Sequence, residues 1–541
     1  MTSFRIRHGS EDLRRKLCEQ KMPPLAARIL SAREITAPED AVPLLETLPR
    51  PDFLPDIDKT CHILAEAIRE QKKICVIGDY DADGLCASAL THECLQELGA
   101  QVTWQIPSRL KHGYGLHEAI VEQAAKDGIG VLLTVDNGIS ANQAVARAKA
   151  LNITVCVTDH HLPPEELPNA DCIVNPKLTT RPEGANLSGS GVAFYVMAAL
   201  RRHMQGKLKM NQFLDLAAVG TVADCMPMDA MNRTIVGAGL EHMRRGRRHG
   251  LAALAGGKRI RGVTCRDISH HIAPRINAAG RFDCADRAMA CLLAKTNDDA
   301  QAAARELSEL NDRRKETVKE IMAQTETMNL GPPAAVAANE AWPPGVSGIV
   351  AGRLANLHQC PAVVFSRCND IWRGSGRAPP EWDLHALTTA VAEECGTDII
   401  LGFGGHRRAV GISASEIEPV KRAFIKHCER LKSLNPPPQW EVDETPPMSE
   451  ITPHAVAYLE RMVWGEEFER PLFAGEFSVS DQRQVGRGHL RMWLRNGDIN
   501  LPAIAFNRVS LSEKAEAVFS LTCDHMTGKV MAVVEEILSP A

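Results

Sequence analysis

The sequence lacks several features that would place the chain in a specialised class of proteins. No apolar stretch approaches the ~20 residues of a membrane-spanning helix. The N-terminal MTSFRIRHGSEDLRRKL has no apolar core of the kind found in signal peptides. There is no internal repeat, and the composition, 44% hydrophobic and 24% charged, is ordinary for globular protein. We therefore expect a cytoplasmic globular protein that makes no contact with a membrane.

Two further absences concern cysteine and charge. The 16 cysteines are scattered, and no two of them form a C-x-x-C pair, which argues against a zinc cluster. In a reducing compartment they are expected to be small core residues. The net charge of −5 excludes a chain that is basic throughout. Any affinity for nucleic acid must come from a local surface or channel.

Short apolar runs alternate with helical patterns between residues 72 and 175. Strands are expected at 72–78, 101–107, 131–135, 153–158 and 172–175. Helices are expected between them at 85–98, 117–127 and 140–151. This alternation is typical of an α/β fold with a mostly parallel sheet and helices on both faces.

The rest of the chain predicts further segments, since 541 residues exceed the size of one core. Residues 297–328 contain no Gly or Pro and predict one long helix. Five short strand-like runs near the C-terminus suggest a small barrel of the OB type. We expect a helical lead-in (1–70), a first α/β domain (71–296), a bridging helix (297–332), a second α/β domain (333–434) and an OB-like β-barrel (440–541).

Potential metal ligands follow three of the predicted strands at the point where each ends. They are Asp79, Asp81 and Asp83, then Asp136, then Asp159, His160 and His161, and Asp224 follows later. The carboxyl ends of parallel strands share one sheet edge, where ligands bind. Carboxylates with imidazole suit Mn²⁺ or Mg²⁺, and two such ions about 4 Å apart can promote phosphoester hydrolysis. A single D-x-D is more often a turn or a helix cap, but its occurrence together with the other ligands favours a metal site.

Four motifs carry a resemblance to a known family. DYDADG (79–84), VDNG (135–138), TDHH (158–161) and GTVADCMP (220–227) resemble, in order and spacing, the motifs of DHH phosphoesterases of the RecJ subgroup. APRINAAGR (273–281), GVSGIVAGRLA (345–355), GSGRA (374–378) and GFGGHRRAVG (402–411) support it, and the last resembles the DHH-associated domain. The resemblance spans roughly residues 24–530. It implies a metal-dependent exonuclease that degrades single-stranded DNA from 5′ to 3′ in recombination and repair.

The resemblance also implies roles for the matching residues. Asp81, Asp83, Asp136, His160 and Asp224 resemble the ligands of two ions, with Asp136 as the bridging carboxylate. His161 resembles a residue that contacts the scissile phosphate or supports the ligands, and Asp79 one that supports the ligands or substitutes for one. Ile77 departs from the pattern, because many relatives have a histidine there. VWGEEFERP (463–471) only loosely resembles the stretch that precedes the terminal barrel.

Substrate contacts are expected at residues with phosphate-binding chemistry, namely Arg109, Arg281, Ser375, Arg377, Gly405 and His406. The glycines of 402–411 are equally compatible with a tight strand-to-helix turn. The basic run HMRRGRRHG (242–250) is either a DNA track or an exposed helix end. Trp493 and Phe506, with Arg491 and Arg495, are either a base-stacking platform or, for Phe506, part of the barrel core.

Two other functions compete with the exonuclease. One is a DHH phosphoesterase acting on short oligonucleotides, cyclic dinucleotides or pyrophosphate, although such enzymes usually lack the long helix and the terminal barrel. The other is an inactive DNA-binding scaffold, which the retained ligand set argues against. The expected partners are single-stranded DNA with a 5′ end, a helicase and a single-strand-binding protein.

Overall fold

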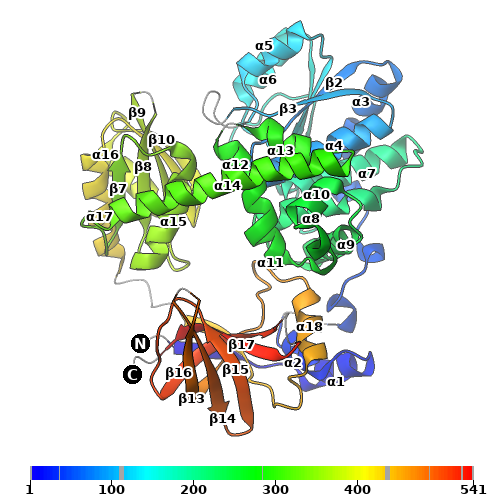
Figure 1. The fold of residues 1–541 in the computed structure, drawn as a ribbon. Helices are drawn as coiled ribbons and strands as arrows, with labels where there is room; N and C mark the ends of the chain where they lie inside the picture. Colours follow the sequence, from blue (N-terminus) through cyan, green and yellow to red (C-terminus); the bar gives the residue numbers. More distant parts are fainter. Residues whose placement is uncertain are drawn as a thin grey trace. The chain divides into compact units, whose positions relative to one another are not determined.

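A computed structural model describes residues 3–33, 35, 37–108, 115–282, 284–368, 370–432, 439–486, 488–524 and 528–538 (Figure 1). The chain divides into two compact units. One contains Glu309–Trp440 with Met1–Ser3, and the other contains Phe4–Ser308 with Glu441–Ala541. Within the described part, no helix is both long enough and apolar enough to cross a membrane.

A five-stranded parallel sheet in the order β3-β2-β4-β5-β6 forms the centre of the larger unit. Its strands are β2 (Lys73–Ile77), β3 (Gln101–Gln105), β4 (Val131–Val135), β5 (Thr154–Thr158) and β6 (Cys172–Val174). Helices α5 (Glu118–Lys126) and α6 (Asn142–Ala150) pack on one face through a buried aliphatic cluster. Helices α3 (Ile57–Arg69), α4 (Ala82–Glu97) and α7 (Gly189–His203) also pack against the sheet (Figure 1). The predicted parallel α/β fold is confirmed.

A helical region follows the sheet. Its helices are α8 (Leu214–Ala223), α9 (Ala230–Arg244), α10 (His249–Leu254), α11 (Cys265–Asp267), α12 (Ala273–Arg281) and α13 (Ala285–Leu292). The long helix α14 (Asn297–Thr325) follows and has 29 residues (Figure 1). It contains no Gly or Pro that would interrupt its hydrogen bonds.

The smaller unit contains a mixed sheet in the order β10-β11-β9-β8-β7. Its elements are β7 (Ala335–Asn339), α15 (Ser347–His358), β8 (Ala362–Cys368), β9 (Ile371–Arg377), α16 (Leu384–Cys395), β10 (Ile400–His406), β11 (Ala409–Ala414) and α17 (Glu418–Lys432). Residues 402–411 form a β-hairpin, so the strand-to-helix turn is wrong. Gly405 has φ +142°, and a Cβ there would lie 2.3 Å from the Ala409 carbonyl oxygen, so this hairpin requires glycine.

Five strands near the C-terminus close into a barrel, as predicted for an OB-like domain. They are β13 (Phe473–Val485), β14 (His489–Asn496), β15 (Ile499–Ala505), β16 (Lys514–Cys523) and β17 (Val530–Ile537). Pairing of β13 with β16 completes the ring. Helix α18 (Pro453–Arg461) packs against β16.

The first residues of the chain differ from the predicted helical lead-in. Ser3–Arg7 forms strand β1, which joins β12 (Gln439–Asp443) beside the barrel. The alternation of Phe4 and Ile6 with two arginines suits a strand at a sheet edge. Helix α1 (Glu11–Glu19) follows, and α2 (Pro24–Ser31) buries Leu25 and Ile29 in the hydrophobic core of the barrel. A helical pattern alone could not show that these residues pack with the other end of the chain.

Candidate metal centre

The three aspartates after β2 are fixed by the start of helix α4. Asp81 is the N-cap residue, and its Oδ1 accepts hydrogen bonds from the N–H groups of Asp83 (3.0 Å) and Gly84 (3.1 Å). Asp83, with its side chain almost fully buried, accepts from the N–H groups of Gly189 (2.6 Å) and Ser190 (3.0 Å) at the first turn of α7. A cation on Asp83 would therefore use the remaining lone pairs of its oxygens.

Asp136, which directly follows β4, is held in an unusual backbone conformation. Its φ is +63°, in the left-handed region that aspartate and asparagine tolerate better than most residues. The carboxylate lies against Gly189, where a Cβ would come within 2.4 Å of it. A Cβ at Gly220 would likewise lie 2.1 Å from Asp83 Oδ1. Two glycines therefore make room for the two buried carboxylates.

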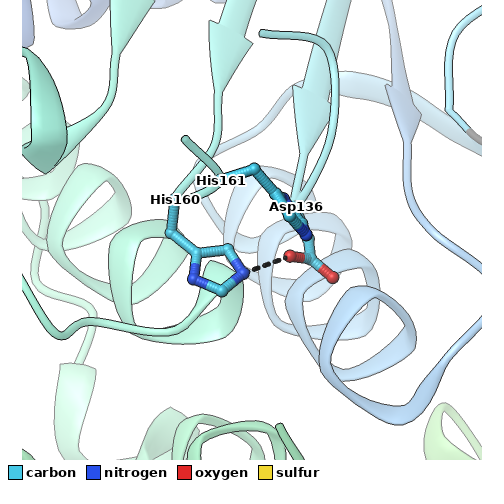
Figure 2. Close-up of side chains that lie close together, drawn as sticks. All are labelled: Asp136, His160 and His161. Atoms are coloured by element: carbon cyan, nitrogen blue, oxygen red, sulfur yellow. Dashed lines mark ion pairs between the residues drawn. The ribbon is translucent and has the colours of Figure 1, made fainter. Parts of the chain in front are cut away.

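His160, two residues after β5, lies close to three carboxylates, and Figure 2 shows its ion pair with one of them, Asp136. Its Nε2 lies 3.0 Å from Asp136 Oδ1, 3.6 Å from Asp224 Oδ2 and 3.9 Å from Asp83 Oδ2. Burial lowers the pKa of His160 to about 4. The ring is therefore neutral at pH 7 and has a nitrogen lone pair to offer to a metal ion.

His161 has the opposite protonation state because of Asp159. Its Nδ1 lies 2.7 Å from Asp159 Oδ1, and Asp159 is completely buried. Burial by itself lowers the pKa of His161, but the hydrogen bond and the negative charge of Asp159 raise it to about 9. Asp159 also accepts from the N–H groups of Ile139, His160 and His161. The two adjacent histidines are thus one neutral and one cationic at pH 7.

The carboxylates repel one another in the absence of a cation. Burial, and then the charges of Asp83 and Asp81, raise the pKa of Asp136 well above its usual range. Partial burial and the charge of Asp83 also raise the pKa values of Asp81 and Asp224. Divalent cations would relieve this repulsion, and their preferred ligands are the carboxylate and imidazole groups present here. The residues therefore fit Mn²⁺ or Mg²⁺.

Among the residues that the structure describes, the potential donors form three overlapping groups, in each of which the ligand atoms lie within 4.8 Å of one another. The groups are Asp79, Asp81 and Asp136; Asp83, His160 and Asp224; and Asp136, His160 and His161. Asp136 belongs to two of them, as a bridging ligand would. Ile77 contributes nothing to these groups, because its fully buried side chain packs in the cluster beneath α5 and α6.

The other predicted residues are distributed over both units. Arg281 ends helix α12, and the preceding Gly280 packs so closely on Tyr80 that a Cβ would lie 2.1 Å from its carbonyl oxygen. This places Arg281 next to the loop that carries the candidate ligands Asp79 and Asp81. Ser375, Arg377, Gly405 and His406 belong to the smaller unit. Arg109 lies outside the described residues.

The basic run 242–250 is partly structural. Arg248 is nearly buried, and its guanidinium lies 2.9 Å from Asp215 and 2.7 Å from Glu93. Arg244 donates to the Val263 carbonyl oxygen. These two arginines therefore stabilise the fold, which neither of the two alternatives for this run foresaw. Arg245 and Arg247 are exposed.

No role was predicted for Gly189 and Ser190, which shape the centre, and Asp159, expected among the potential ligands, instead orients His161. The run SGSG (188–191) at the beginning of a helix was an available signal, because a helix N-terminus with glycines binds anions. Here the anion is the Asp83 carboxylate. The buried position of Asp159 had no signal beyond its place in TDHH.

Known domain families and proteins match most of this chain. The N-terminal domain of the DHH family matches residues 73–221, the DHHA1 domain 331–433 and the RecJ OB domain 442–533. The single-stranded-DNA-specific exonuclease RecJ of Haemophilus influenzae is 34% identical over 90% of this chain and 89% of its own length. Crystal structures of Thermus thermophilus RecJ in complex with Mn²⁺ and with Mg²⁺ match at 27% identity, with TM-scores of 0.83 and 0.77. Both matches extend over 100% of this chain. They include 80% of the Thermus chain in the Mn²⁺ complex and 79% in the Mg²⁺ complex. The chain belongs to the RecJ family of DHH phosphoesterases.

Proposed function

We propose that this protein is a metal-dependent exonuclease that hydrolyses the phosphodiester bonds of single-stranded DNA from the 5′ end. The convergence of Asp136 with two further groups of ligands at one sheet edge carries the proposal. Asp79 and Asp81 would hold a first ion, Asp83, His160 and Asp224 would hold a second, and Asp136 would be shared between them. Two such ions activate water as a nucleophile and stabilise the leaving oxygen.

His161 is suited to contact the substrate rather than a cation. Burial lowers the pKa of His161, but the hydrogen bond to Asp159 outweighs this and raises the pKa to about 9. The ring is therefore protonated at pH 7. A cationic imidazole attracts the scissile phosphate and holds a proton near the departing oxygen. Asp159 orients this ring, and the Asn175 side chain fixes the loop by donating to the His161 carbonyl oxygen (2.9 Å).

The barrel offers a surface for bases. Along β14 the side chains of Leu490, Met492 and Leu494 are buried, so Arg491, Trp493 and Arg495 point to the opposite side. Phe506 is 50% exposed and meets the His489 ring edge to face at 5.1 Å, so a place in the barrel core is wrong for it. Aromatic rings flanked by arginines support base stacking and backbone binding by single strands.

We also propose a cellular location and partners for the enzyme. All sixteen cysteines are free, which supports a reducing compartment such as the cytoplasm. A helicase would supply single strands, and a single-strand-binding protein would share them; both are proposed partners in recombination and repair.

Substrate choice tests the proposal. We expect rapid release of nucleotides from long single-stranded DNA with Mn²⁺, and little hydrolysis of duplex DNA, a dinucleotide or pyrophosphate. The measurement is product formation from each substrate at equal phosphate concentration. A preference for the dinucleotide or pyrophosphate would favour another DHH phosphoesterase, and DNA binding without hydrolysis would favour the inactive scaffold.

Arg377 is proposed to bind the 5′ phosphate. Its side chain lies over the first turn of α15, where a Cβ on Gly348 would be 3.1 Å from Nη2, and Ser375 is beside it. An arginine, a hydroxyl and a helix N-terminus together suit a phosphate. We expect Arg377→Ala to slow cleavage of a 5′-phosphorylated oligonucleotide about tenfold more than that of its 5′-hydroxyl twin. Arg373→Ala, on the same strand, is the matched control. Equal losses on both substrates would make Arg377 a general backbone contact.

A further inference from the structure

The connection between α18 and β13 contains a tight turn, which we call the 465–468 turn. The Gly465 N–H donates to the Phe468 carbonyl oxygen (3.1 Å), and the Phe468 N–H donates to the Gly465 carbonyl oxygen (3.3 Å). Phe468 is buried and stacks on Trp464 at 5.2 Å. The turn lies in VWGEEFERP (463–471), a stretch without a predicted function, and it precedes the barrel strand β13.

This turn pairs with the loop that carries Asp224. Pro227 and Glu466 form a parallel β-bridge, and the Met228 N–H donates to the Glu466 carbonyl oxygen at 2.8 Å. The Met228 side chain also leaves no room for a side chain at position 465. A Cβ on Gly465 would lie 2.7 Å from Met228 Cγ and 3.0 Å from its Cε.

Two residues of helix α9, Asn232 and Arg233, also contact this loop. The Arg233 guanidinium lies 4.2 Å from the centre of the Phe468 ring and also donates to the Met228 carbonyl oxygen (3.4 Å). The Asn232 side chain donates to the Pro227 carbonyl oxygen at 2.8 Å. Pro227 and Met228 are therefore anchored by both helix α9 and the 465–468 turn.

Asp224 depends on this anchor more than the other ligands do. Its side chain is 34% exposed, against 6% for His160, 3% for Asp136 and 1% for Asp83. Packing holds the latter three, whereas Asp224 is the C-cap residue of α8 and is followed by Cys225 in the left-handed region, φ +54°. Only three residues separate Asp224 from Met228, so a shift of the Met228 backbone would change the position of the Asp224 carboxylate.

We propose that the 465–468 turn positions Asp224 for metal binding and thereby links the DNA-binding barrel to the metal centre. The proposal rests on the ligand role proposed for Asp224. Gly465 and Phe468 are positioning residues in this view: they touch neither substrate nor metal, and they act through Met228.

Gly465→Ala tests the proposal, because the added methyl group must push Met228 away. We expect the Mn²⁺ concentration that gives half the maximal rate to rise about tenfold, the lower end of the loss caused by disturbing groups that orient metal ligands. The maximal rate at saturating Mn²⁺ should be largely retained. Gly465→Ala/Met228→Ala removes the atoms that the methyl group meets, and should return the half-saturating concentration towards the wild-type value.

The matched control is Gly237→Ala, whose Cβ would meet Val463 of the same connection at an ordinary 3.6 Å. It should leave the metal response unchanged. If Gly465→Ala does not fold, Phe468→Leu disturbs the turn more gently and should shift the metal response in the same direction. Unfolding temperature in EDTA and oligonucleotide binding by anisotropy are recorded for every variant.

Asp224→Asn, measured in the same series, separates the two proposals. The half-saturating Mn²⁺ concentration could rise in Asp224→Asn and stay unchanged in both Gly465→Ala and Phe468→Leu. That result would overturn the role of the turn and leave the ligand role of Asp224 intact. An unchanged metal response in Asp224→Asn would overturn the ligand role and the positioning proposal together. A lowered unfolding temperature with an unaltered metal response would show that the turn only stabilises the fold.

Discussion

Asp136→Asn should abolish exonuclease turnover while leaving the fold and the affinity for single-stranded DNA intact. Asparagine has the shape of aspartate and tolerates the left-handed backbone at φ +63°, so the substitution isolates the loss of one negative charge. That charge belongs to two of the three ligand groups. Bound metal contributes several kcal/mol to phosphoester hydrolysis, so we expect the rate to fall about 10³-fold or more.

The matched control is Asp171→Asn, at the opposite end of the same sheet. The Asp171 Oδ2 accepts the Val155 N–H at 2.8 Å, and an amide oxygen can replace it. Its rate should be that of the wild-type protein. A loss of only a few-fold in Asp136→Asn would show that Asp136 does not serve both ions.

Asp136→Asn, although it should abolish turnover, should stabilise the metal-free protein. Burial and the neighbouring carboxylates raise the pKa of Asp136, so its charged form destabilises the folded protein at pH 7. Removing the charge should raise the unfolding temperature in EDTA and reduce the further rise caused by Mn²⁺. Thermal unfolding with and without Mn²⁺ measures both effects.

The sequence predicted the sheet edge well because parallel strands impose their own geometry. β4 was expected at 131–135 and occupies Val131–Val135, and ligands that follow β2, β4 and β5 must meet at one edge. The long helix and the five-stranded barrel were also predictable, since each depends on a local pattern.

Features that depend on contacts between distant segments could not be predicted. Nothing near Asp83 in the sequence indicates that its carboxylate accepts hydrogen bonds from Gly189 and Ser190, more than 100 residues later. Two other features also depend on residues far apart in the sequence. They are the pairing of β1 with β12 and the burial of Arg248 between Asp215 and Glu93. Such contacts are long-range, and composition reports only that a residue is charged or apolar.

Removal of divalent metal should eliminate activity altogether. Protein dialysed against excess EDTA is expected to be inactive, and Mn²⁺ should restore hydrolysis at least as well as Mg²⁺, because the donors combine carboxylates with the neutral imidazole of His160. Burial lowers the pKa of His160 to about 4, so no proton competes with the ion at pH 7. Product release from a labelled single strand, measured across a range of Mn²⁺ concentrations, is the test.

The same titration should stabilise the metal-free protein, because the ions neutralise mutually repelling carboxylates that only the folded chain brings together. An ion at about 100 times its dissociation constant adds about 2.7 kcal/mol to the free energy of unfolding. Ca²⁺ is a useful control, since it also prefers oxygen ligands but accepts longer and less regular coordination. We expect Ca²⁺ to stabilise the fold and to support little hydrolysis, so binding and catalysis separate. Full activity in EDTA would refute the metal mechanism, and a metal-dependent rate with no stabilisation by any cation would place the ions on the substrate instead of on these side chains.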